Sequence, residues 1–504
     1  MKTADQGILW RGLCVLQRDS AVTLQAQIRQ AVIQAIHERR LLPDSAMPST
    51  RTLADALDVS RNTVVQAYER LVDDGYLSSE ASSGHRIQAR AYADAALPAA
   101  APSAHAASDA TAGAAPNWAA RLGPGTSAFR YVRKPIDWQR YPFPFVFGQF
   151  DPTLFPAADW REASALAMRR MAVRDWAGDR IDRDDPALVK QIQSRVLTRR
   201  GIWAAADEIL ITLGSQQAMF LISTLIRPHA RCVGLEEPGY PDLHNLFRLS
   251  GTPTRSLELG AEGLRADDQL EGCDYVFVAP SHQNPTCRTM PLAARRALLD
   301  AAVARDFVIV EDDYDSELSF DNSATPSIKS LDGSGRVLYV GSLSKTIAAG
   351  LRMGFVVAPA PVIRELRALR RLMLRHPPAN NQRAVALFFS LGHYDALLPR
   401  LTEAYRSRAQ VLCAALEEYL PQLKFAAPRG GSAVWLAAPD GTDMVAVRDR
   451  ALVHGVVFDA GIDFFAAESA PRHQFRLGYS SIALDQIAPG VRALAACMRE
   501  AGTA

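Results

Sequence analysis

A lysine framed by small and hydroxyl-bearing residues is the first candidate for chemistry in this chain. The stretch GSLSKTIAAGLRMG occupies residues 341–354 and follows an apolar run, 337–340, that predicts a buried strand. A lysine that forms a Schiff base with an aldehyde cofactor needs a desolvated, closely framed site, and Lys345 has small neighbours. Ser342, Ser344 and Arg352 could bind a phosphate through hydroxyls and a planar cation. A solvated surface lysine is the alternative, so the other parts of such a site have to be present elsewhere.

Several further polar groups each follow a short apolar run that predicts a strand. Ligands bind beyond the carboxyl ends of the strands in open α/β sheets, so shared placement predicts a shared site. Gly214, Ser215 and Gln216 open a helical pattern, where free backbone N–H groups and the helix dipole attract a phosphate. Tyr240 could stack on an aromatic ring, or it is an ordinary loop tyrosine.

Three polar residues follow the next two predicted strands, and they could form hydrogen bonds with the nitrogen and the phenolic oxygen of a substituted pyridine ring. Asn284 could donate a hydrogen bond to a phenolic oxygen, or simply build its Asn-Pro turn. Asp312 could pair with a protonated pyridine nitrogen, and Tyr314 could share the phenolic oxygen with Asn284. Acidic residues at strand ends also bind metals, but a metal would leave Lys345 and Tyr240 without a role, so we expect no metal. Together these groups predict a site for pyridoxal 5′-phosphate (PLP).

Length and composition limit the classes of protein that this chain could represent. A chain of 504 residues should contain at least two domains, and 48% hydrophobic residues suffice for a large core. The net charge of +2 neither demands nor excludes a nucleic-acid partner. There is no apolar stretch near the roughly 20 residues that span a bilayer, and no apolar signal segment at the start. Scattered cysteines without a Cys-x-x-Cys pair favour a reducing compartment, so we expect a cytoplasmic protein.

The N-terminal part of the chain, residues 15–90, is predicted to fold as one compact unit. One helix face is predicted from apolar residues at every fourth position, Leu24, Ile28, Val32 and Ile36. Two shorter helices follow, with start signals at residues 48–50 and at Ser60, and a tight turn joins them. This is the helix-turn-helix arrangement.

The second helix of this pair begins with side chains that could read DNA. Arg61, Asn62 and Thr63 stand at its exposed start, and in such motifs these positions enter the major groove. The residues that follow, 76–87, predict a β-hairpin with Gly84 at its polar tip. A small helical dimerisation module is the alternative that the pattern alone allows.

The segment PSTRTLADALDVSRNTVVQAYERLVDDGYL, residues 48–77, closely resembles the GntR-type winged-helix DNA-binding domain. The resemblance implies double-stranded operator DNA as a partner. The residues that it assigns to DNA contact are Arg51, Arg61, Asn62, Thr63 and Gly84. Val65 stands where some relatives have a basic residue, so one base contact of those members is expected to be absent.

A linker is predicted between residues 91 and 140. Alanine, proline and serine dominate its first part, with almost nothing large to bury, and prolines recur too often for one long helix. From residue 141 to residue 504, apolar runs alternate with helical patterns, which predicts a mostly parallel α/β domain.

The order of the polar groups in this second domain resembles the class I aminotransferase fold, known as fold type I among PLP proteins. The resemblance implies that Lys345 carries the cofactor, Asp312 pairs with the pyridine nitrogen and Tyr240 is the stacking ring. Asn284 and Tyr314 become contacts of the phenolic oxygen O3′. The phosphate cradle becomes Gly214, Ser215, Gln216, Ser342 and Arg352. The strand FRLGYS, residues 475–480, matches the strand that holds a ligand carboxylate, which assigns that role to Arg476.

Three departures from the aminotransferase pattern bear on the site. Cys287 replaces the glycine usual after Asn-Pro-Thr, so this loop is expected to be shaped differently. Asp242 lies near a position where some relatives carry an arginine, which suggests a ligand with a cationic far end. The segment 176–186 lacks the aromatic-Pro-Gly pattern common there in the enzymes.

A GntR-type winged helix joined by a linker to an aminotransferase-like domain is the layout of the MocR/GabR family of bacterial transcription regulators. The resemblance implies a head-to-tail homodimer that binds operator DNA through its N-terminal domains. We expect a regulator rather than an enzyme, in which a small amine or amino acid forms an external aldimine with PLP and alters operator binding. The alternatives are an active aminotransferase with an accessory winged helix, and a regulator that has lost PLP. Residual transaminase half-reactions are compatible with the regulator.

Overall fold

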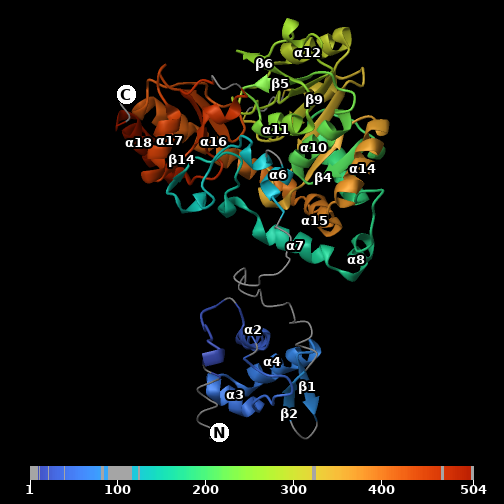
Figure 1. Cartoon of the computed structure of the whole chain (residues 1–504), viewed down its shortest axis with the longest axis vertical. Helices are drawn as coiled ribbons and strands as arrows, with labels where there is room; N and C mark the ends of the chain where they lie inside the picture. The colour runs from blue at the N-terminus through green and yellow to red at the C-terminus, as the bar shows by residue number, and fades with distance from the viewer. Residues whose placement is uncertain are drawn as a thin grey trace. The chain divides into compact units, whose positions relative to one another are not determined.

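The computed structural model describes residues 10, 12–20, 22–38, 40–80, 84–88, 116–122, 125–320, 325–466 and 470–500. The chain forms two compact units that divide after Arg121, and both are drawn in Figure 1. The alanine-rich part of the predicted linker, 91–115, lies outside the described residues, as do residues 81–83 of the predicted hairpin tip.

The main elements among the described residues of the first unit are three helices and a hairpin. They are α2 (Leu24–His37), α3 (Thr50–Leu57), α4 (Arg61–Asp73), β1 (Leu77–Glu80) and β2 (Gly84–Ile87). The predicted helix face is buried at Ile28, Val32 and Ile36, and β1 pairs antiparallel with β2. The N–H groups of Thr52 and Thr63 donate to the hydroxyl oxygens of the caps Ser49 and Ser60 (3.1 Å each). The predicted winged helix-turn-helix fold is confirmed.

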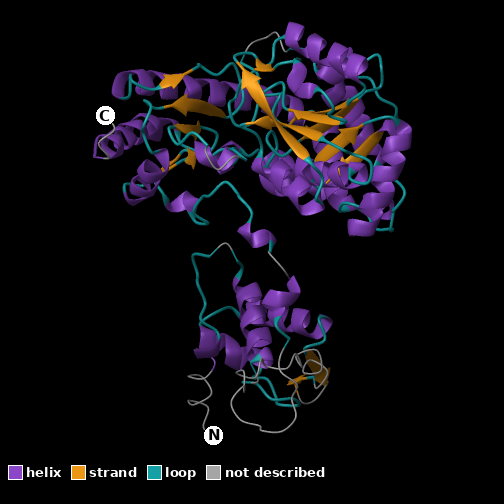
Figure 2. Ribbon diagram, turned by 45° about the horizontal axis from the view of Figure 1, so that its top comes forward, coloured by secondary structure: helices purple, strands orange, loops and turns teal. Residues whose placement is uncertain are grey.

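An eight-stranded mixed sheet lies at the centre of the second unit (Figure 2). Its strand order is β4–β11–β10–β9–β8–β5–β6–β7, and β11 runs antiparallel to both of its neighbours. The strands are β4 (Ile209–Thr212), β5 (Val233–Glu237), β6 (Thr254–Gly260), β7 (Gly263–Leu264), β8 (Tyr275–Val278), β9 (Val308–Asp313), β10 (Val337–Ser342) and β11 (Gly354–Val357). Because β5, β8, β9 and β10 are parallel, their carboxyl ends meet at one edge, as the sequence predicts.

Helices cover both faces of this sheet. Leu338 and Val340 of β10 pack with α10, α11 and α14, whereas Tyr339 packs with α15 and α16 on the opposite face. These helices, with α12, are α10 (Gly214–Ile226), α11 (Pro241–Ser250), α12 (Leu292–Arg305), α14 (Ala360–Leu374), α15 (Ala379–Ser390) and α16 (His393–Tyr419). The other α-helices of this part are α7 (Ala157–Ala167), α8 (Arg170–Trp176), α9 (Pro186–Gln191) and α13 (Ile328–Leu331). The short helix α6 (Trp118–Leu122) contains Arg121, the last residue of the first unit.

A smaller antiparallel sheet forms the C-terminal part of the second unit. Its strands, in spatial order, are β12 (Lys424–Phe425), β13 (Ala433–Ala437), β16 (Gln474–Gly478) and β15 (Asp459–Ala460). It packs with α17 (Met444–Val453) and α18 (Leu484–Glu500), while β14 (Val456–Val457) pairs with β3 (Phe143–Pro144). Within the described part of the chain, no helix has the length and apolar character needed to cross a bilayer. The predicted aminotransferase-like α/β fold is confirmed.

Residues 125–140, the last part of the interval predicted to be a linker, belong to the second unit and make contacts within it. Trp138 is buried, and Nη1 of Arg130 donates to the carbonyl oxygen of Phe465 (2.7 Å). The side-chain amide of Asn245 on α11 donates to the carbonyl oxygen of Arg130 (2.6 Å). Large side chains account for this contact, because a residue such as Trp138 has apolar area to bury and the alanine-rich stretch has little.

Candidate functional site

Lys345 lies just beyond the carboxyl end of β10, where the sequence predicts it. Its Nζ donates to the carbonyl oxygen of Gly148 (3.4 Å) and lies 4.8 Å from the centre of the Phe147 ring. Burial lowers the pKa of Lys345 to about 8, and the partly opposing charges of Asp315 and Arg476 also act on it. An amine with this pKa is more often uncharged near neutral pH than an ordinary lysine, which makes it a better nucleophile.

Asp312 of β9 faces a pocket that it lines together with Tyr240 and Asn284. Its Oδ1 is buried and has no hydrogen-bond partner among the described residues. Burial, together with the neighbouring charges of Asp313 and Asp315, raises the pKa of Asp312 to about 8. A buried carboxylate oxygen without a donor is costly, and a protonated ring nitrogen would be such a donor. The pocket therefore fits a pyridine ring.

The other acidic residues of β9 have partners of their own. Asp313 accepts hydrogen bonds from Nε of Arg200 and from the hydroxyl of Tyr339 (2.7 Å each). Glu311 accepts two backbone N–H groups (2.9 and 2.8 Å). Strand alternation directs Glu311 and Asp313 to the face opposite Asp312, so the three acids do not act together. No three side chains that could ligate a metal gather anywhere in the described part of the chain.

The first turn of α10 forms one side of the site together with Arg352. Nη2 of Arg352 donates to the carbonyl oxygen of Leu213 (3.1 Å), and its guanidinium covers Gly214. Gly214 has a φ of +76°, and a Cβ there would lie 2.8 Å from Nη2 of Arg352. A Cβ on Gly354 would lie 2.7 Å from the carbonyl carbon of Gly214. These glycines allow backbone N–H groups and a guanidinium to gather at one point, an arrangement that suits a phosphate.

The remaining residues predicted to hold the phosphate lie beside this turn. Ser215 and Gln216 belong to the first turn of α10, and Oε1 of Gln216 accepts the hydroxyl of Tyr240 (2.7 Å). Ser342 ends β10, and its Oγ accepts the N–H of Ser344 (3.3 Å). The hydroxyl of Tyr240 thus points toward the predicted phosphate side, while its ring lines the pocket that contains Asp312.

Arg476 reaches the site from β16 of the smaller sheet. Its Nε and Nη2 donate to Oδ2 of Asp459 (3.0 and 2.8 Å), and its Nη1 donates to Oδ1 of Asn284 (2.8 Å). Two aromatic rings enclose the guanidinium, since its Cζ lies 3.7 Å from the centre of Phe147 and 4.5 Å from that of Phe464. Arg476 is thus joined directly to one predicted cofactor contact, Asn284.

The departures from the aminotransferase pattern have local explanations in the structure. Cys287 has a φ of +58°, so it takes the left-handed conformation that glycine adopts without strain. Oδ2 of Asp242 lies 2.9 Å from the hydroxyl of Tyr240, so its carboxylate already has a partner beside the site. In the segment 176–186, Asp184 pairs with two arginines of α14.

Three residues of this site carry no signal in the sequence analysis. The ring of Phe147 contacts the cationic groups of Lys345 and Arg476 and meets the ring of Tyr314 edge-on at 6.1 Å. Gly148 has a φ of +70° and supplies the carbonyl oxygen for Lys345, and Asp459 balances the charge of Arg476. None of the three belongs to a recognisable motif. For Asp312 the sequence does contain a further signal. Side chains alternate along a strand, so Asp312 faces away from Glu311 and Asp313.

The first unit presents most of the residues predicted to bind DNA to solvent. Arg61 and Asn62 are exposed at the start of α4, and Arg51 is exposed on α3. Gly84 begins β2 with a φ of +89°. The hydroxyl of Thr63 lies 2.8 Å from that of the cap residue Ser60, so it also supports the helix start.

Comparisons with known proteins identify a matching family for each of the two units. The family of bacterial regulatory proteins, gntR family, matches residues 24–87, and the family aminotransferase class I and II matches residues 178–477. The HTH-type transcriptional regulator TauR of Rhodobacter capsulatus is 40% identical over 478 residues, which cover 95% of this chain and 97% of TauR. The probable rhizopine catabolism regulatory protein MocR of Rhizobium meliloti is 29% identical over 500 residues, covering 96% and 95%.

A solved enzyme structure matches the second unit. LysN, an α-aminoadipate aminotransferase from Thermus thermophilus complexed with N-(5′-phosphopyridoxyl)-L-leucine, superposes with a TM-score of 0.69 and 29% identity, covering 76% of this chain and 98% of LysN. Both family matches occur in the order expected, and two named regulators align along nearly the whole chain. The protein therefore belongs to the MocR/GabR family of DNA-binding transcriptional regulators, in which a GntR-type winged helix precedes an aminotransferase-like domain.

Proposed function

We propose that a small amine or amino acid, bound with PLP at Lys345, controls DNA binding by this regulator. One observation carries the proposal. A lysine whose pKa is lowered to about 8 lies in the same site as Asp312, whose buried Oδ1 has no partner among the described residues. When bound there, PLP supplies an aldehyde that combines reversibly with amines and a ring that withdraws electrons.

Each part of the cofactor has a candidate partner in this chain. Asp312 would accept a hydrogen bond from the ring nitrogen, and Tyr240 would cover one face of the ring. Asn284 and Tyr314 would contact O3′. The phosphate would be held by Gly214, Ser215, Gln216, Ser342 and Arg352. Arg476 would bind an acidic group of the effector, because Asp459 and Asn284 already fix the orientation of its guanidinium.

The effector must favour one arrangement of the protein to change its affinity for DNA. A ligand shifts an equilibrium only by as much as it binds one state better than the other. We propose a head-to-tail homodimer, in which two winged helices read the two half-sites of an operator. An effector that changes their spacing alters the fit to the half-sites, and coupling of this kind typically changes affinity about 5- to 150-fold.

The test uses the full chain loaded with PLP and a DNA fragment selected by this protein from a random-sequence pool. Amines and amino acids are screened first for a change in the visible absorption band, and those that change it are added to DNA-binding titrations at fixed salt. We expect at least one of them to change the Kd for DNA by several-fold. The proposal fails if every compound that changes the band leaves the Kd for DNA unaltered.

An active aminotransferase is the second candidate, favoured by the lowered pKa of Lys345, which suits an amine that moves protons. Sensing and turnover require the same cofactor contacts, so the site alone does not separate them. Turnover assays with a panel of amino donors and keto-acid acceptors do. We expect single half-reactions at most. Sustained turnover at ordinary enzyme rates would show that the protein is an active aminotransferase as well as a regulator.

Capture of PLP by the cofactor-free protein should depend on pH through Lys345. Its protonated amine cannot attack an aldehyde, so the rate of band formation is expected to rise with pH and to level off above about 8, instead of near the unshifted value of 10.5. Rapid-mixing absorbance at constant ionic strength measures this profile. The charge of Asp315 raises the pKa of Lys345, so Asp315→Asn should move the midpoint to lower pH. A midpoint near 10.5 would contradict the assignment.

A further inference from the structure

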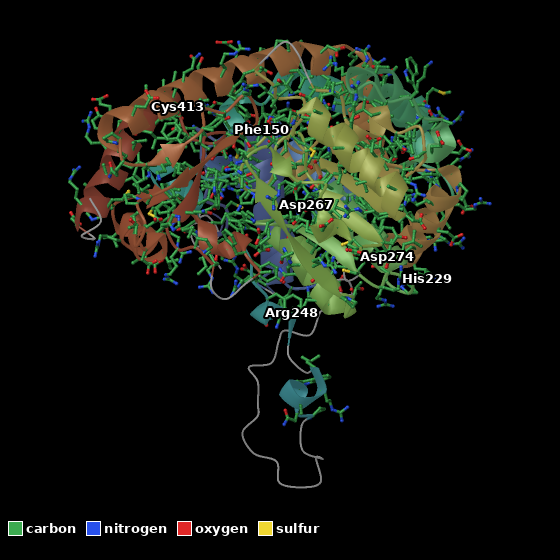
Figure 3. The ribbon with its side chains drawn as sticks, turned by 90° about the horizontal axis from the view of Figure 1, so that it is seen from above. Phe150, His229, Arg248, Asp267, Asp274 and Cys413 are labelled. Carbon is green, nitrogen blue, oxygen red and sulfur yellow. The ribbon has the colours of Figure 1, made fainter. Side chains whose placement is uncertain are left out.

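A small cavity beside Lys345 is lined by residues that adjoin both sheets of the second unit. Lys345 and Ser344 follow β10 of the larger sheet, whereas Ser432 precedes β13 and Ser480 follows β16 of the smaller sheet. Phe150, which is labelled in Figure 3, supplies an apolar part of the lining. The volume of the cavity, counted as the space that the centre of a water molecule can occupy, is about 10 Å³. A cavity needs about 10–15 Å³ by this measure to hold one water molecule.

Three buried hydroxyl groups belong to this lining. The side chains of Ser344, Ser432 and Ser480 are 6%, 5% and 2% exposed, and none of their Oγ atoms has a hydrogen-bond partner in the described part of the chain. Their backbones are held, because the carbonyl oxygen of Ser432 accepts the N–H of Tyr479 (2.9 Å) and that of Ser480 accepts Nη1 of Arg408 (2.6 Å). A buried hydroxyl without a partner is unfavourable, so three around one small cavity indicate a shared partner inside it.

The amine of Lys345 has unused donors on the same side. Among the described residues its Nζ makes one long hydrogen bond, to the carbonyl oxygen of Gly148 (3.4 Å), and Gly148 also lines the cavity. A protonated amine has three N–H donors. It does not reach the three hydroxyls directly, since those have no partner among the described residues. A water molecule makes about three hydrogen bonds and joins polar groups that are too far apart for a direct one.

We propose that this cavity binds one water molecule, and that Ser432 and Ser480 position the amine of Lys345 through it. Ser344 supplies the third hydroxyl. Because the two positioning serines adjoin the smaller sheet and Lys345 follows a strand of the larger one, the reactivity of the amine depends on how the two sheets are held together. The water site belongs to the cofactor-free protein, so only its relevance to sensing rests on the proposed function.

The sign of a stability change distinguishes a bound water from unpaired hydroxyls. If the water is bound, Ser432→Ala and Ser480→Ala each remove one of its hydrogen bonds, and the free energy of unfolding of the cofactor-free protein should fall. If it is not, each substitution removes an unpaired buried hydroxyl, and the free energy of unfolding should rise. Chemical denaturation measures both variants. An increase in either one would overturn the proposal.

Ser223→Ala is the matched control for these variants. Ser223 is 3% exposed on α10, outside the cavity lining, and its Oγ donates directly to the carbonyl oxygen of Phe220 (3.0 Å). It should lose stability to a similar extent, because it also loses one satisfied buried hydrogen bond.

The effect on Lys345 is measured without PLP. Acetic anhydride reacts with the uncharged amine, so the acetylation of the Lys345 peptide against pH, normalised to a reference amine, gives a midpoint expected near 8 in the parent. The water accepts a hydrogen bond from the charged amine and so stabilises it. The double variant Ser432→Ala with Ser480→Ala should therefore have a midpoint about one pH unit lower, the effect of one hydrogen bond to a charged group. Ser223→Ala should keep the midpoint of the parent.

A second variant removes the water in another way. Ser432→Val fills the cavity and should lower the midpoint to a similar extent. The charged groups that act on the amine are unchanged in all of these variants, and they are Asp315, Arg476, Lys134 and Asp312. The shift therefore reports the water and its hydroxyl partners.

The outcomes are separate from those of the proposed function, because neither measurement uses the cofactor. If the midpoints shift as expected but the parent captures no PLP, the proposed function fails and the water site stands. If the parent captures PLP but the double variant and Ser432→Val keep the parental midpoint, the two serines do not position Lys345. A crystal structure of the cofactor-free parent should show the water within hydrogen-bond distance of at least two of the three hydroxyls, and a cavity without it would contradict the site directly.

Discussion

Lys345→Ala is expected to abolish covalent capture of PLP while the protein still folds. Its Nζ is the amine held beside Phe147 and Gly148, close enough for its charge to act on Asp312, and alanine leaves no group there that can react with an aldehyde. After addition of PLP, the variant should show no cofactor band in the visible range. After borohydride reduction, peptide mass spectrometry should find the cofactor on the peptide that contains Lys345 in the parent and on no corresponding peptide in the variant.

Two opposing effects keep this substitution from unfolding the protein. The pKa of Lys345 falls from 10.5 to about 8, so its charged form costs the folded state about 3 kcal/mol at neutral pH. That cost is full below about pH 8 and disappears above 10.5, where the amine is neutral in both states. Alanine removes the cost, but it also removes three buried methylenes worth about 2 kcal/mol. The free energy of unfolding should therefore change little, as chemical denaturation of the cofactor-free proteins would measure.

A matched lysine controls for adventitious reaction with PLP. Lys190 is exposed on α9, so Lys190→Ala should keep the full cofactor band. A band of parental size in Lys345→Ala would show that another amine captures the cofactor, and the assignment of Lys345 would then be wrong. Loss of the band together with a large loss of stability would instead indicate a folding defect, which the denaturation experiment detects.

The features that were predictable from the sequence are those set by local spacing. The helices of the first unit follow from apolar residues at every fourth position and from the caps Ser49 and Ser60, which act within three residues of themselves. The site edge of the sheet follows from short apolar runs that each end in a polar group, because parallel strands bring those ends together. Lys345 and Asp312 could therefore be assigned to one site before any contact was known.

Contacts across long sequence separations were not predictable in this way. Lys345 meets Gly148 from 197 positions away, and Arg130 meets Phe465 from 335 positions away. Such contacts depend on how the smaller sheet packs against the larger one, and no local pattern encodes that packing. For the same reason, the sequence predicts a linker over the whole interval 91–140. Its end contains large side chains, such as Trp138, whose partners lie elsewhere in the chain.

The three consecutive acidic residues on β9 can be distinguished by the alternation of side chains along a strand. The sequence places Glu311, Asp312 and Asp313 side by side, which allows a metal site as well as a cofactor partner. Successive side chains of a strand point to opposite faces. Glu311 and Asp313 therefore share one face, and Asp312 lies alone on the other. In the structure Asp313 is bound by Arg200, whereas the buried Oδ1 of Asp312 has no hydrogen-bond partner in the part of the chain that the structure describes. That difference makes Asp312 the cofactor candidate.

Arg61→Ala is expected to cause the largest loss of DNA affinity of any single substitution in the first unit. Arg61 is exposed at the first position of α4, and its Nε donates a long hydrogen bond to the hydroxyl of Thr50 (3.4 Å). The N-terminal residues of such a helix read base edges in the major groove, where a good arginine contact contributes about 1–3 kcal/mol. The proposed dimer would lose this contact at both half-sites, so the expected loss is about 2–6 kcal/mol, or roughly 30-fold to more than 10,000-fold in Kd.

Salt dependence and a control on the same helix decide what Arg61 contacts. Arg70→Ala removes an equal charge from the last turn of α4, which should lie away from the groove, so it should weaken binding only slightly. If Arg61 contacts bases, the slope of log K against log salt stays as in the parent and discrimination between operator variants falls. If it contacts a phosphate, the slope decreases by about 1 for each subunit and all sequences weaken alike. If Arg61→Ala and Arg70→Ala bind DNA with equal affinity, Arg61 is not part of the recognition surface. If the PLP band of Arg61→Ala is unchanged, the substitution affects DNA binding and not the cofactor site.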